Sequence, residues 1–395
     1  MKIYADNAAT TRVSDHALKA MMPYFQEQYG NPSSLYELGQ KAQEALDDAR
    51  GRMARLLNCQ AREIIFTGGG SEANNQAILT AAKLGAKQGK KHIISTAFEH
   101  HAVLHPLEAL KEEGFDITLL DVHEHGLVTA EEVAQAIRSD TCLVTIMFAN
   151  NEIGTIQPIK EIGKVCKEKS VLFHTDAVQA VGHEPIDVQD MNIDMLSLSA
   201  HKFHGPKGVG ALYVKRGIVI APLIRGGAQE KNKRAGTENV PLIMGMAAAM
   251  EDACENMEEN SVKIRQMRDY LIDEISQIPH SVLNGDRQQR LSGNVNFCFE
   301  GIEGEGLLLL LDDKGVCASS GSACTSGSLD PSHVLLSIGR PHEIAHGSLR
   351  LSICEDNTIE EMQAIVRAVK EVVEYLRSIS PVWTDLKQGK QQHII

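Results

Sequence analysis

A lysine and a carboxylate occupy equivalent positions at the ends of two short apolar segments. Residues 195–202 end at Lys202, and residues 171–176 end at Asp176. Each segment is too short for an ordinary helix and is rich in residues that suit a buried strand, so we expect two parallel strands with a polar residue at each carboxyl end. Ligands of open α/β sheets bind at that edge of the sheet.

An amine and a carboxylate in one crevice suit pyridoxal 5'-phosphate (PLP). The lysine forms a Schiff base with the aldehyde, and the carboxylate keeps the pyridine nitrogen protonated, so the ring becomes an electron sink. Ser199 and His201 are positioned to bind a phosphate, and Gln179 follows Asp176 by three residues. Without these neighbours, the usual interpretation would be a solvated lysine and a helix-capping aspartate.

A glycine-rich segment at residues 67–74 follows a predicted strand and opens a helix. Its backbone N–H groups and the helix dipole would face an anion. No Gly-Lys-Ser/Thr follows, which argues against a nucleotide P-loop, and the dinucleotide spacing Gly-x-Gly-x-x-Gly also fails. A single phosphate fits the segment better, and a flexible strand-to-helix turn is the alternative.

Histidines are concentrated after the predicted strand at residues 92–95. Glu99, His100, His101 and His105 could suggest a metal site, because His101 and His105 lie one helical turn apart. The glutamate is not placed as in His-Glu-x-x-His, however, and no third ligand is apparent. We expect His100 to lie in the same crevice as Lys202, where an imidazole can stack on a cofactor ring and exchange protons.

Cys324 lies in a segment of small and polar residues, 318–328. Cysteines within apolar runs, such as Cys142 and Cys298, normally act as small buried hydrophobes, and Cys324 lacks such neighbours. A flexible segment can hold a thiol near a site in one step and expose it in the next, which suits a nucleophile that collects and hands over a group. The alternative is a surface loop with an incidental cysteine.

Composition limits the possible partners and location. The chain has 395 residues, 43% of them hydrophobic, and a formal net charge of −13, so its surface should repel nucleic acids and anionic membranes. The apolar run at 306–311 is far too short to span a bilayer, and residues 2–5 resemble a strand rather than a signal peptide. We expect a cytosolic protein with reduced cysteines.

Strands alternate with amphipathic helices from residue 63 to 214, which is typical of a parallel sheet covered on both faces. The expected strands are 63–66, 92–95, 117–120, 142–147, 171–174, 195–198 and 210–214. A long helix over 241–277 and a smaller α+β region with a final helix at 358–378 should follow. The polar tail after Pro381 is expected to be mobile.

The ordered motifs resemble the cysteine desulfurases of the NifS/IscS branch, within the class V aminotransferase group of fold-type I PLP enzymes. They cover almost the whole chain and comprise residues 4–11, 30–34, 99–100, 150–154, 174–179, 199–202, 234–239, the Cys324 segment and 346–350. The resemblance implies an α/β fold with a large, mostly parallel-sheet PLP-binding domain at 15–255. Residues 1–14 and 256–395 would form a small α+β domain that carries the catalytic cysteine.

The resemblance also implies roles for the cofactor residues. Lys202 would bind the PLP aldehyde and move the proton at the substrate α-carbon, Asp176 would pair with the pyridinium, and His100 would stack on the ring and assist proton transfer. Gln179 would contact the ring hydroxyl. The phosphate would be bound by Gly70, Ser71, Ser199 and His201, and by Thr237 from the second subunit of a homodimer.

Substrate roles follow from the same resemblance. Asn151, beside the cofactor, and Arg350 would bind the carboxylate of L-cysteine, because a guanidinium offers two parallel donors. Cys324 would attack the substrate sulfur, leaving a persulfide on the enzyme and L-alanine as product. An iron–sulfur scaffold protein or another acceptor would then receive the sulfur.

Two positions depart from the common pattern of this family, and two other functions stay open. Ser71 stands where threonine is usual, which retains the hydroxyl, and Lys231 and Asn232 replace a frequent Arg-Gly pair. Another class V aminotransferase or lyase would share Lys202 and Asp176 but would have no use for the thiol. A non-catalytic sulfur-trafficking scaffold would lack the cofactor.

Overall fold

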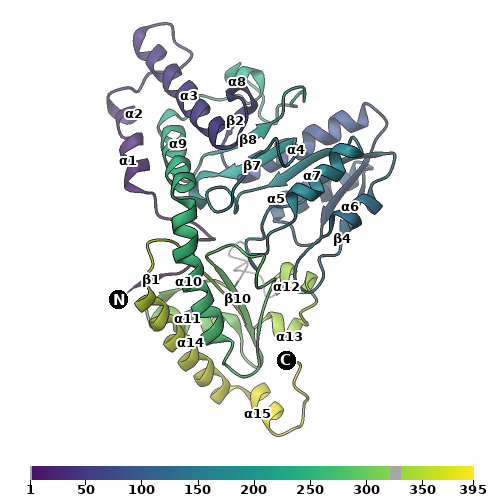
Figure 1. Ribbon diagram of the computed structural model, residues 1–395, viewed down its shortest axis with the longest axis vertical. Coiled ribbons are helices and arrows are strands. Elements are labelled where there is room, and N and C mark those ends of the chain that lie inside the picture. The colour runs from purple at the N-terminus through teal and green to yellow at the C-terminus, as the bar shows by residue number, and fades with distance from the viewer. Residues whose placement is uncertain (1, 321–330) are drawn as a thin grey trace.

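The computed structural model describes residues 2–320 and 331–395. Its largest sheet has seven strands in the order β2-β8-β7-β6-β5-β3-β4 (Figure 1). These strands are β2 (Ile64–Thr67), β3 (His92–Thr96), β4 (Asp116–Leu120), β5 (Thr141–Thr145), β6 (Leu172–Asp176), β7 (Met195–Ser199) and β8 (Gly210–Val214). All the strands expected between residues 63 and 214 are therefore confirmed, with small shifts of their ends.

Strand β8 is the antiparallel member of a sheet that is otherwise parallel, as the expected mostly parallel sheet allows. It runs antiparallel to both of its neighbours, β7 and β2, whereas β3, β4, β5, β6 and β7 pair in parallel. Residues 200–209 connect β7 to β8, and a parallel return needs a crossover of about a dozen residues or more, usually through a helix. The short connection therefore forces the chain to reverse direction.

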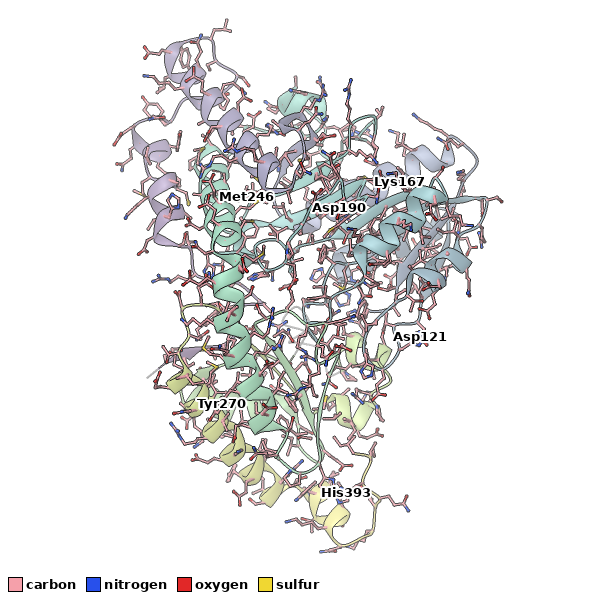
Figure 2. The ribbon with its side chains drawn as sticks, in the orientation of Figure 1. Asp121, Lys167, Asp190, Met246, Tyr270 and His393 are labelled. Atoms are coloured by element: carbon pink, nitrogen blue, oxygen red, sulfur yellow. The ribbon has the colours of Figure 1, made fainter. Side chains whose placement is uncertain are left out.

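Helices cover both faces of this sheet. Successive strand residues point to opposite sides, and apolar residues on each side pack against a different set of helices. Ile93 and Leu143 pack with α4 (Gly70–Ala86) and α5 (His101–Glu112). Their neighbours Ile94 and Val144 belong to a different core with α3 (Glu37–Leu56), α7 (Ile159–Glu168) and α9 (Val240–Glu255). Met246 of α9, labelled in Figure 2, is fully buried in that core. Buried strands thus provide a rigid base for the residues at their carboxyl ends.

A second, three-stranded antiparallel sheet lies below the large one in Figure 1. It comprises β9 (Ser281–Leu283), β10 (Asn294–Phe299) and β12 (Ser348–Ser352), in the order β12-β10-β9. Its core includes residues of α10 (Met257–Ile275), α11 (Gly304–Asp313) and α14 (Ile359–Ile379), together with Ile3 and Ala5. The amino-terminal strand β1 (Ile3–Tyr4) pairs with β11 (Val316–Cys317). The domain boundaries at residues 14 and 255 stay a prediction.

Two helical features differ from the sequence-based expectation. The long helix expected at 241–277 is divided into α9 and α10 at Asn256, whose side chain donates to the Asp252 carbonyl oxygen over 2.9 Å. The tail contains α15 (Pro381–Lys387), which is capped by Ser380 and buries Trp383, and His393 stacks on His280. Burial of a large aromatic side chain gives this polar segment an anchor that its average composition conceals.

The remaining elements are short or lie at the edges of the molecule. They are α1 (Asp15–Met21), α2 (Pro23–Gln26), η1 (Ala61–Glu63), α6 (Ala130–Ala136), η2 (Ala200–Lys202), α8 (Gln229–Asn232), α12 (His333–Ser337) and α13 (His342–Ala345). Among the helices of the described residues, none combines the length and the apolar character needed to cross a membrane.

Candidate active site

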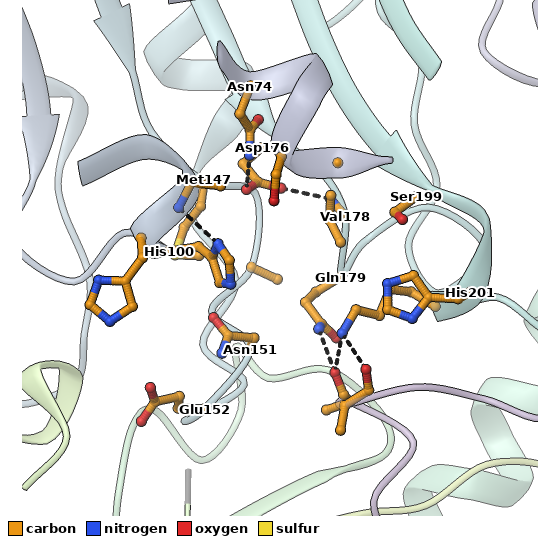
Figure 3. Close-up of a pocket in the computed structure, with 18 of the residues that line it drawn as sticks. Asn74, His100, Met147, Asn151, Glu152, Asp176, Val178, Gln179, Ser199 and His201 are labelled. Atoms are coloured by element: carbon orange, nitrogen blue, oxygen red, sulfur yellow. Dashed lines mark hydrogen bonds between the residues drawn. The ribbon is translucent and has the colours of Figure 1, made fainter. Parts of the chain in front are cut away.

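A cavity of about 280 Å³ lies where the carboxyl ends of the parallel strands meet the smaller sheet (Figure 3). Ten residues predicted from the sequence line it: Gly70, Ser71, His100, Asn151, Asp176, Gln179, Ser199, His201, Lys202 and Arg350. Thr237 is exposed and is not among the lining residues. Cys324 lies outside the described residues.

Asp176 ends β6 and is held from two sides. Its Oδ2 accepts a hydrogen bond of 2.6 Å from Asn74 Nδ2, and its Oδ1 accepts one of 3.0 Å from the backbone N–H of Val178 (Figure 3). Asn74 lies one turn into α4, which starts at the glycine-rich segment. These bonds fix the orientation of a carboxylate that is only 5% exposed. Such a group can pair with a protonated ring nitrogen.

Lys202 reaches the amino-terminal segment of the chain. Its Nζ donates to the carbonyl oxygens of Ala8 and Ala9 over 2.5 and 2.8 Å. Gln179 Nε2 donates to the same Ala8 carbonyl over 3.0 Å. Residues 8 and 9 therefore form one wall of the cavity and position the lysine amine.

The start of α4 lies at one end of the site and has the chemistry to bind an anion. Gly70 begins the helix, and a Cβ atom there would lie only 2.6 Å from Val178 Cγ2. A second hollow is lined by residues 68–71 together with Ser199 and His201. Helix N–H groups and hydroxyls that face one space suit a phosphate.

An ion pair holds the glycine-rich segment in place. Glu72 Oε2 accepts a hydrogen bond of 2.7 Å from the backbone N–H of Gly68, and Glu72 Oε1 accepts one of 2.9 Å from Arg234 Nε. Arg234 precedes the exposed Thr237 in the 234–239 segment. The contact connects the start of α4 to that segment.

His100 caps α5 and lies between Met147 and Asn151 in Figure 3. Its Nδ1 accepts a hydrogen bond of 3.0 Å from the backbone N–H of Ala102. Burial lowers the pKa of His100, so the ring is neutral near pH 7 and carries its proton on Nε2. The imidazole therefore offers a donor at Nε2 and a flat face for stacking.

The neighbouring Glu99 is fully buried. Its Oε1 accepts hydrogen bonds from Thr96 Oγ1 over 2.7 Å and from the backbone N–H of Met147 over 2.9 Å. Burial nevertheless raises the pKa of this carboxyl to about 8. Glu99 is thus mainly protonated at neutral pH, which avoids an uncompensated charge beside the cavity.

Arg350 brings a buried cation from the smaller sheet. It lies on β12 and is 2% exposed. Its Nη2 pairs with Asp6 Oδ1 at 2.9 Å, and its Nη1 donates to the Asn151 carbonyl oxygen over 3.0 Å. These contacts orient the planar guanidinium at the cavity, where it can take a substrate carboxylate.

Several cavity residues were not predicted from the sequence. Asn74 could have been found from its position one turn after Gly70, but His333 had no local signal. The His333 ring centroid lies 4.7 Å from that of His101, which in turn lies 4.9 Å from that of His105. The fold thus adds the His333 imidazole to the neighbouring rings of His101 and His105. It lies at the cavity wall with His101.

The residues at the two ends of the cavity match the two ends of a PLP molecule. The Asp176 carboxylate, the Lys202 amine and the flat His100 ring surround one end, while Gly70, at the start of α4, leaves no Cβ to block the other. The carboxylate, amine and backbone N–H donors match the ring nitrogen, aldehyde and phosphate of this cofactor.

The fold and this site define a PLP-dependent enzyme of the class V aminotransferase family, to which the chain belongs. The family model described as "Aminotransferase class-V" matches residues 3–365. The chain is 53% identical over 394 residues to the cysteine desulfurase IscS of Clostridium botulinum (strain Hall), with 99% of each chain covered. It is also 53% identical over 380 residues to IscS of Methanosarcina thermophila, covering 96% of this chain and 94% of that one.

Similar solved structures point to the same kind of protein as these relatives. A NifS-like protein superposes with a TM-score of 0.90 at 37% identity, covering 95% of this chain and 100% of that one. A structure described as SspA in complex with cysteine gives a TM-score of 0.79 at 39% identity, covering 89% and 99%. The chain is therefore similar over nearly its full length to cysteine desulfurases of the NifS and IscS type.

Proposed function

We propose that this PLP-dependent enzyme is a cysteine desulfurase that converts L-cysteine to L-alanine and supplies sulfur for iron–sulfur cluster assembly. The observation that carries the proposal is the convergence of Lys202, Asp176 and the buried Arg350 on one cavity. The lysine and carboxylate serve the cofactor, and the guanidinium serves an α-amino acid carboxylate. The full-length similarity to cysteine desulfurases selects this reaction among those of the family.

The cavity residues divide the work between binding and proton transfer. Bound PLP supplies an electron sink for negative charge at the substrate α-carbon. Lys202 moves the proton at that carbon, and Asp176 holds the ring nitrogen in its protonated form. Arg350 and Asn151 bind the substrate carboxylate, so the α-carbon faces the lysine. Asp6 keeps the guanidinium in place for this contact.

His100 is proposed to stack on the ring and to donate through Nε2. Its Nδ1 is occupied by the N–H of Ala102, so the neutral ring has no lone pair directed into the cavity. The residue can therefore stabilise developing negative charge by donating a hydrogen bond. It can accept a proton only after the contact with Ala102 breaks.

Cys324 is the proposed sulfur acceptor. In the net reaction, the Cβ–S bond of L-cysteine breaks, an S–S bond forms on Cys324, and a proton replaces sulfur at the β-carbon to give L-alanine. Burial raises the pKa of Cys59 and Cys166 to about 12 and that of Cys142, Cys254 and Cys298 to about 11. These thiols stay protonated and are poor nucleophiles.

A homodimer is also proposed, with Thr237 of one subunit completing the phosphate site of the other. The exposed position of Thr237, close in sequence to Arg234 and its contact with the glycine-rich segment, supports this arrangement. Two further points stay predictions. One is the protein that receives the sulfur from Cys324, either an iron–sulfur scaffold protein or another acceptor, and the other is the cytoplasmic location.

One experiment tests the reaction directly. The absorbance spectrum of the purified protein is recorded before and after addition of L-cysteine, and alanine and sulfide are assayed in the presence of a thiol reductant. The desulfurase is supported if the cofactor absorbance changes with L-cysteine and if alanine and sulfide form in equal amounts. Cofactor absorbance without alanine would favour another class V reaction, and a colourless protein would favour a non-catalytic scaffold.

A further inference from the structure

A second group of chemically reactive side chains lies beside the Lys202 segment. His204 follows Lys202 by two residues, and Cys354 and Glu355 follow strand β12, which carries Arg350. One ligand atom from each of His204, Cys354 and Glu355 lies within 4.8 Å of the other two. Imidazole nitrogen, thiolate sulfur and carboxylate oxygen are the ligand types that zinc takes in proteins.

The hydrogen bonds of His204 direct one lone pair toward this group. Its Nδ1 lies 3.0 Å from the Arg12 carbonyl oxygen, and a carbonyl can only accept, so Nδ1 carries the hydrogen. In the neutral ring the lone pair is therefore on Nε2. That atom is buried and has no hydrogen-bond partner within the described residues. Metal-binding histidines commonly show this pattern, with the other ring nitrogen donating to a backbone carbonyl.

The spacing suits a small cation. His204 Nε2 and Glu355 Oε1 are 3.5 Å apart. Two ligands at about 2.0–2.1 Å from a tetrahedral zinc ion are separated by roughly 3.3 Å, so a shift of a few tenths of an ångström would bring both into coordination. The Cys354 side chain lies against the same ring and is 7% exposed.

The backbone around these ligands is already held in place. His204 has a left-handed φ of 63°, and its N–H donates to Thr11 Oγ1 over 2.8 Å. The N–H of Cys354 donates to Asn357 Oδ1 over 3.0 Å. A histidine in a left-handed conformation is uncommon, and it persists when surrounding contacts determine it. The ligands therefore need little reorganisation to bind an ion.

Space for a fourth ligand adjoins the group. A cavity of about 40 Å³ is lined by His204, Cys354, His183 and Lys202. A cavity of about 10–15 Å³ already admits the centre of one water molecule. A water molecule there could complete the four-coordinate geometry that three protein ligands leave open.

We propose that His204, Cys354 and Glu355 bind one zinc ion per chain. On binding, the Cys354 thiol releases its proton to solvent and coordinates as the thiolate. The ion then joins the segment that follows Lys202 to the end of the strand that carries Arg350. None of the three ligands lines the PLP cavity, and the existence of the zinc site does not depend on the desulfurase reaction.

A proton is the competing occupant of the same nitrogen. Burial lowers the pKa of His204, but contacts with Cys354 and Glu355 outweigh it and raise the value to about 10. A metal-free ion pair between His204 and Glu355 is therefore the alternative arrangement. Direct measurement of the metal distinguishes the two.

Zinc binding is measured on the PLP-loaded, full-length protein. The background variant is Cys324→Ala, so that the Cys324 thiol cannot contribute a ligand. After chelator treatment and dialysis, the protein is titrated with Zn²⁺ against a competing chromophoric chelator. Parallel titration with Co²⁺ records the charge-transfer absorbance of a cobalt–thiolate bond. The expected result is one ion per chain with a thiolate signature.

Three variants locate the site. Cys354→Ser should remove the thiolate absorbance and weaken zinc binding at least tenfold, and His204→Asn should weaken it similarly, since asparagine tolerates the left-handed backbone. Cys59→Ser, at a partly buried cysteine outside the group, should leave binding unchanged. Circular dichroism and PLP absorbance check that each variant is folded. Equal zinc affinity in the Cys354→Ser and background proteins, or less than one tightly bound ion per chain in the background protein, would overturn the proposal.

Discussion

Asn74 donates a hydrogen bond of 2.6 Å to Asp176, across a separation of 102 residues in the chain. The bond links the helix that begins at the glycine-rich segment to the carboxylate proposed to keep the cofactor ring nitrogen protonated. One amide thereby couples the proposed phosphate end of the cavity to its proposed pyridine end. Displacement of α4 would disturb both cofactor contacts together.

Replacement of Asn74 by alanine should therefore impair catalysis more than folding. A hydrogen bond to a charged group is worth about 1.5–3 kcal/mol, which corresponds to roughly a ten- to hundredfold loss of kcat/KM if it acts fully in the transition state. Alanine release and the cofactor absorbance are measured for Asn74→Ala. Asn75→Ala is the control, because its side chain bonds the Ser71 carbonyl within the same helix. Equal kinetics for both variants would contradict the role of Asn74.

Lys202→Ala should abolish turnover while leaving the fold and much of the PLP affinity intact. The phosphate and ring contacts come from other residues, but no other amine is proposed to move the α-proton. Alanine formation and retention of PLP during gel filtration are measured. Lys215→Ala removes an exposed lysine that pairs with Asp194, and it should behave as the wild type. Normal turnover by Lys202→Ala would refute the assignment.

Cys324→Ala should still bind PLP and L-cysteine but release almost no alanine, because the acceptor thiol is missing. Mass spectrometry of the wild type after brief treatment with L-cysteine, without reductant, should find one added sulfur on the peptide that carries Cys324. Cys59→Ala should retain activity, since burial keeps that thiol protonated. Sulfur on another cysteine would overturn the proposed acceptor.

Gly70→Ala should weaken PLP binding, because the new Cβ would lie 2.6 Å from Val178 Cγ2 and shift either α4 or the segment after Asp176. We expect at least a tenfold rise in the dissociation constant, measured by PLP absorbance on equilibrium dialysis. Gly51→Ala makes the same chemical change within α3, where the nearest atom is 3.9 Å away. That control should bind PLP normally and gain up to about 1 kcal/mol of stability. Similar PLP affinity in both variants would exclude close packing at Gly70.

Titration of Glu99 should lower the free energy of unfolding as the pH rises toward 8. Its folded-state pKa is raised by burial from 4.5 to about 8, so between these values the folded protein holds a proton that the unfolded chain has lost. Within this window, each pH unit lowers the free energy of unfolding by up to about 1.4 kcal/mol. Glu99→Gln removes the titration, so its stability relative to wild type should increase with pH.

Urea unfolding at about pH 5.5 and about pH 7.5 measures that difference. Glu108→Gln is the control, because its side chain is 71% exposed and its charge remains solvated. The relative stability of this control should change little between the two pH values. A pH-independent difference for Glu99→Gln would mean that Glu99 does not titrate as proposed.

The sequence alone determined the strands of the large sheet and the residues at their carboxyl ends. Segments such as 171–176 and 195–202 combine apolar composition, short length and a terminal polar residue, and these properties are local. Because the strands are parallel neighbours, Asp176 and Lys202 then necessarily lie at the same edge. The cofactor class could be predicted from these two residues together with their neighbours Ser199, His201 and Gln179.

Only the tertiary structure decided which distant groups complete the site. Residues 4–11 form a recognisable motif, but nothing local in it indicates that the Ala8 and Ala9 carbonyls hold Lys202 or that Asp6 pairs with Arg350. The His333 imidazole has no local signal at all. Their positions depend on how the smaller sheet and the amino-terminal segment pack against the larger sheet. Such packing is set by many weak, long-range contacts at once, so no window of sequence contains it.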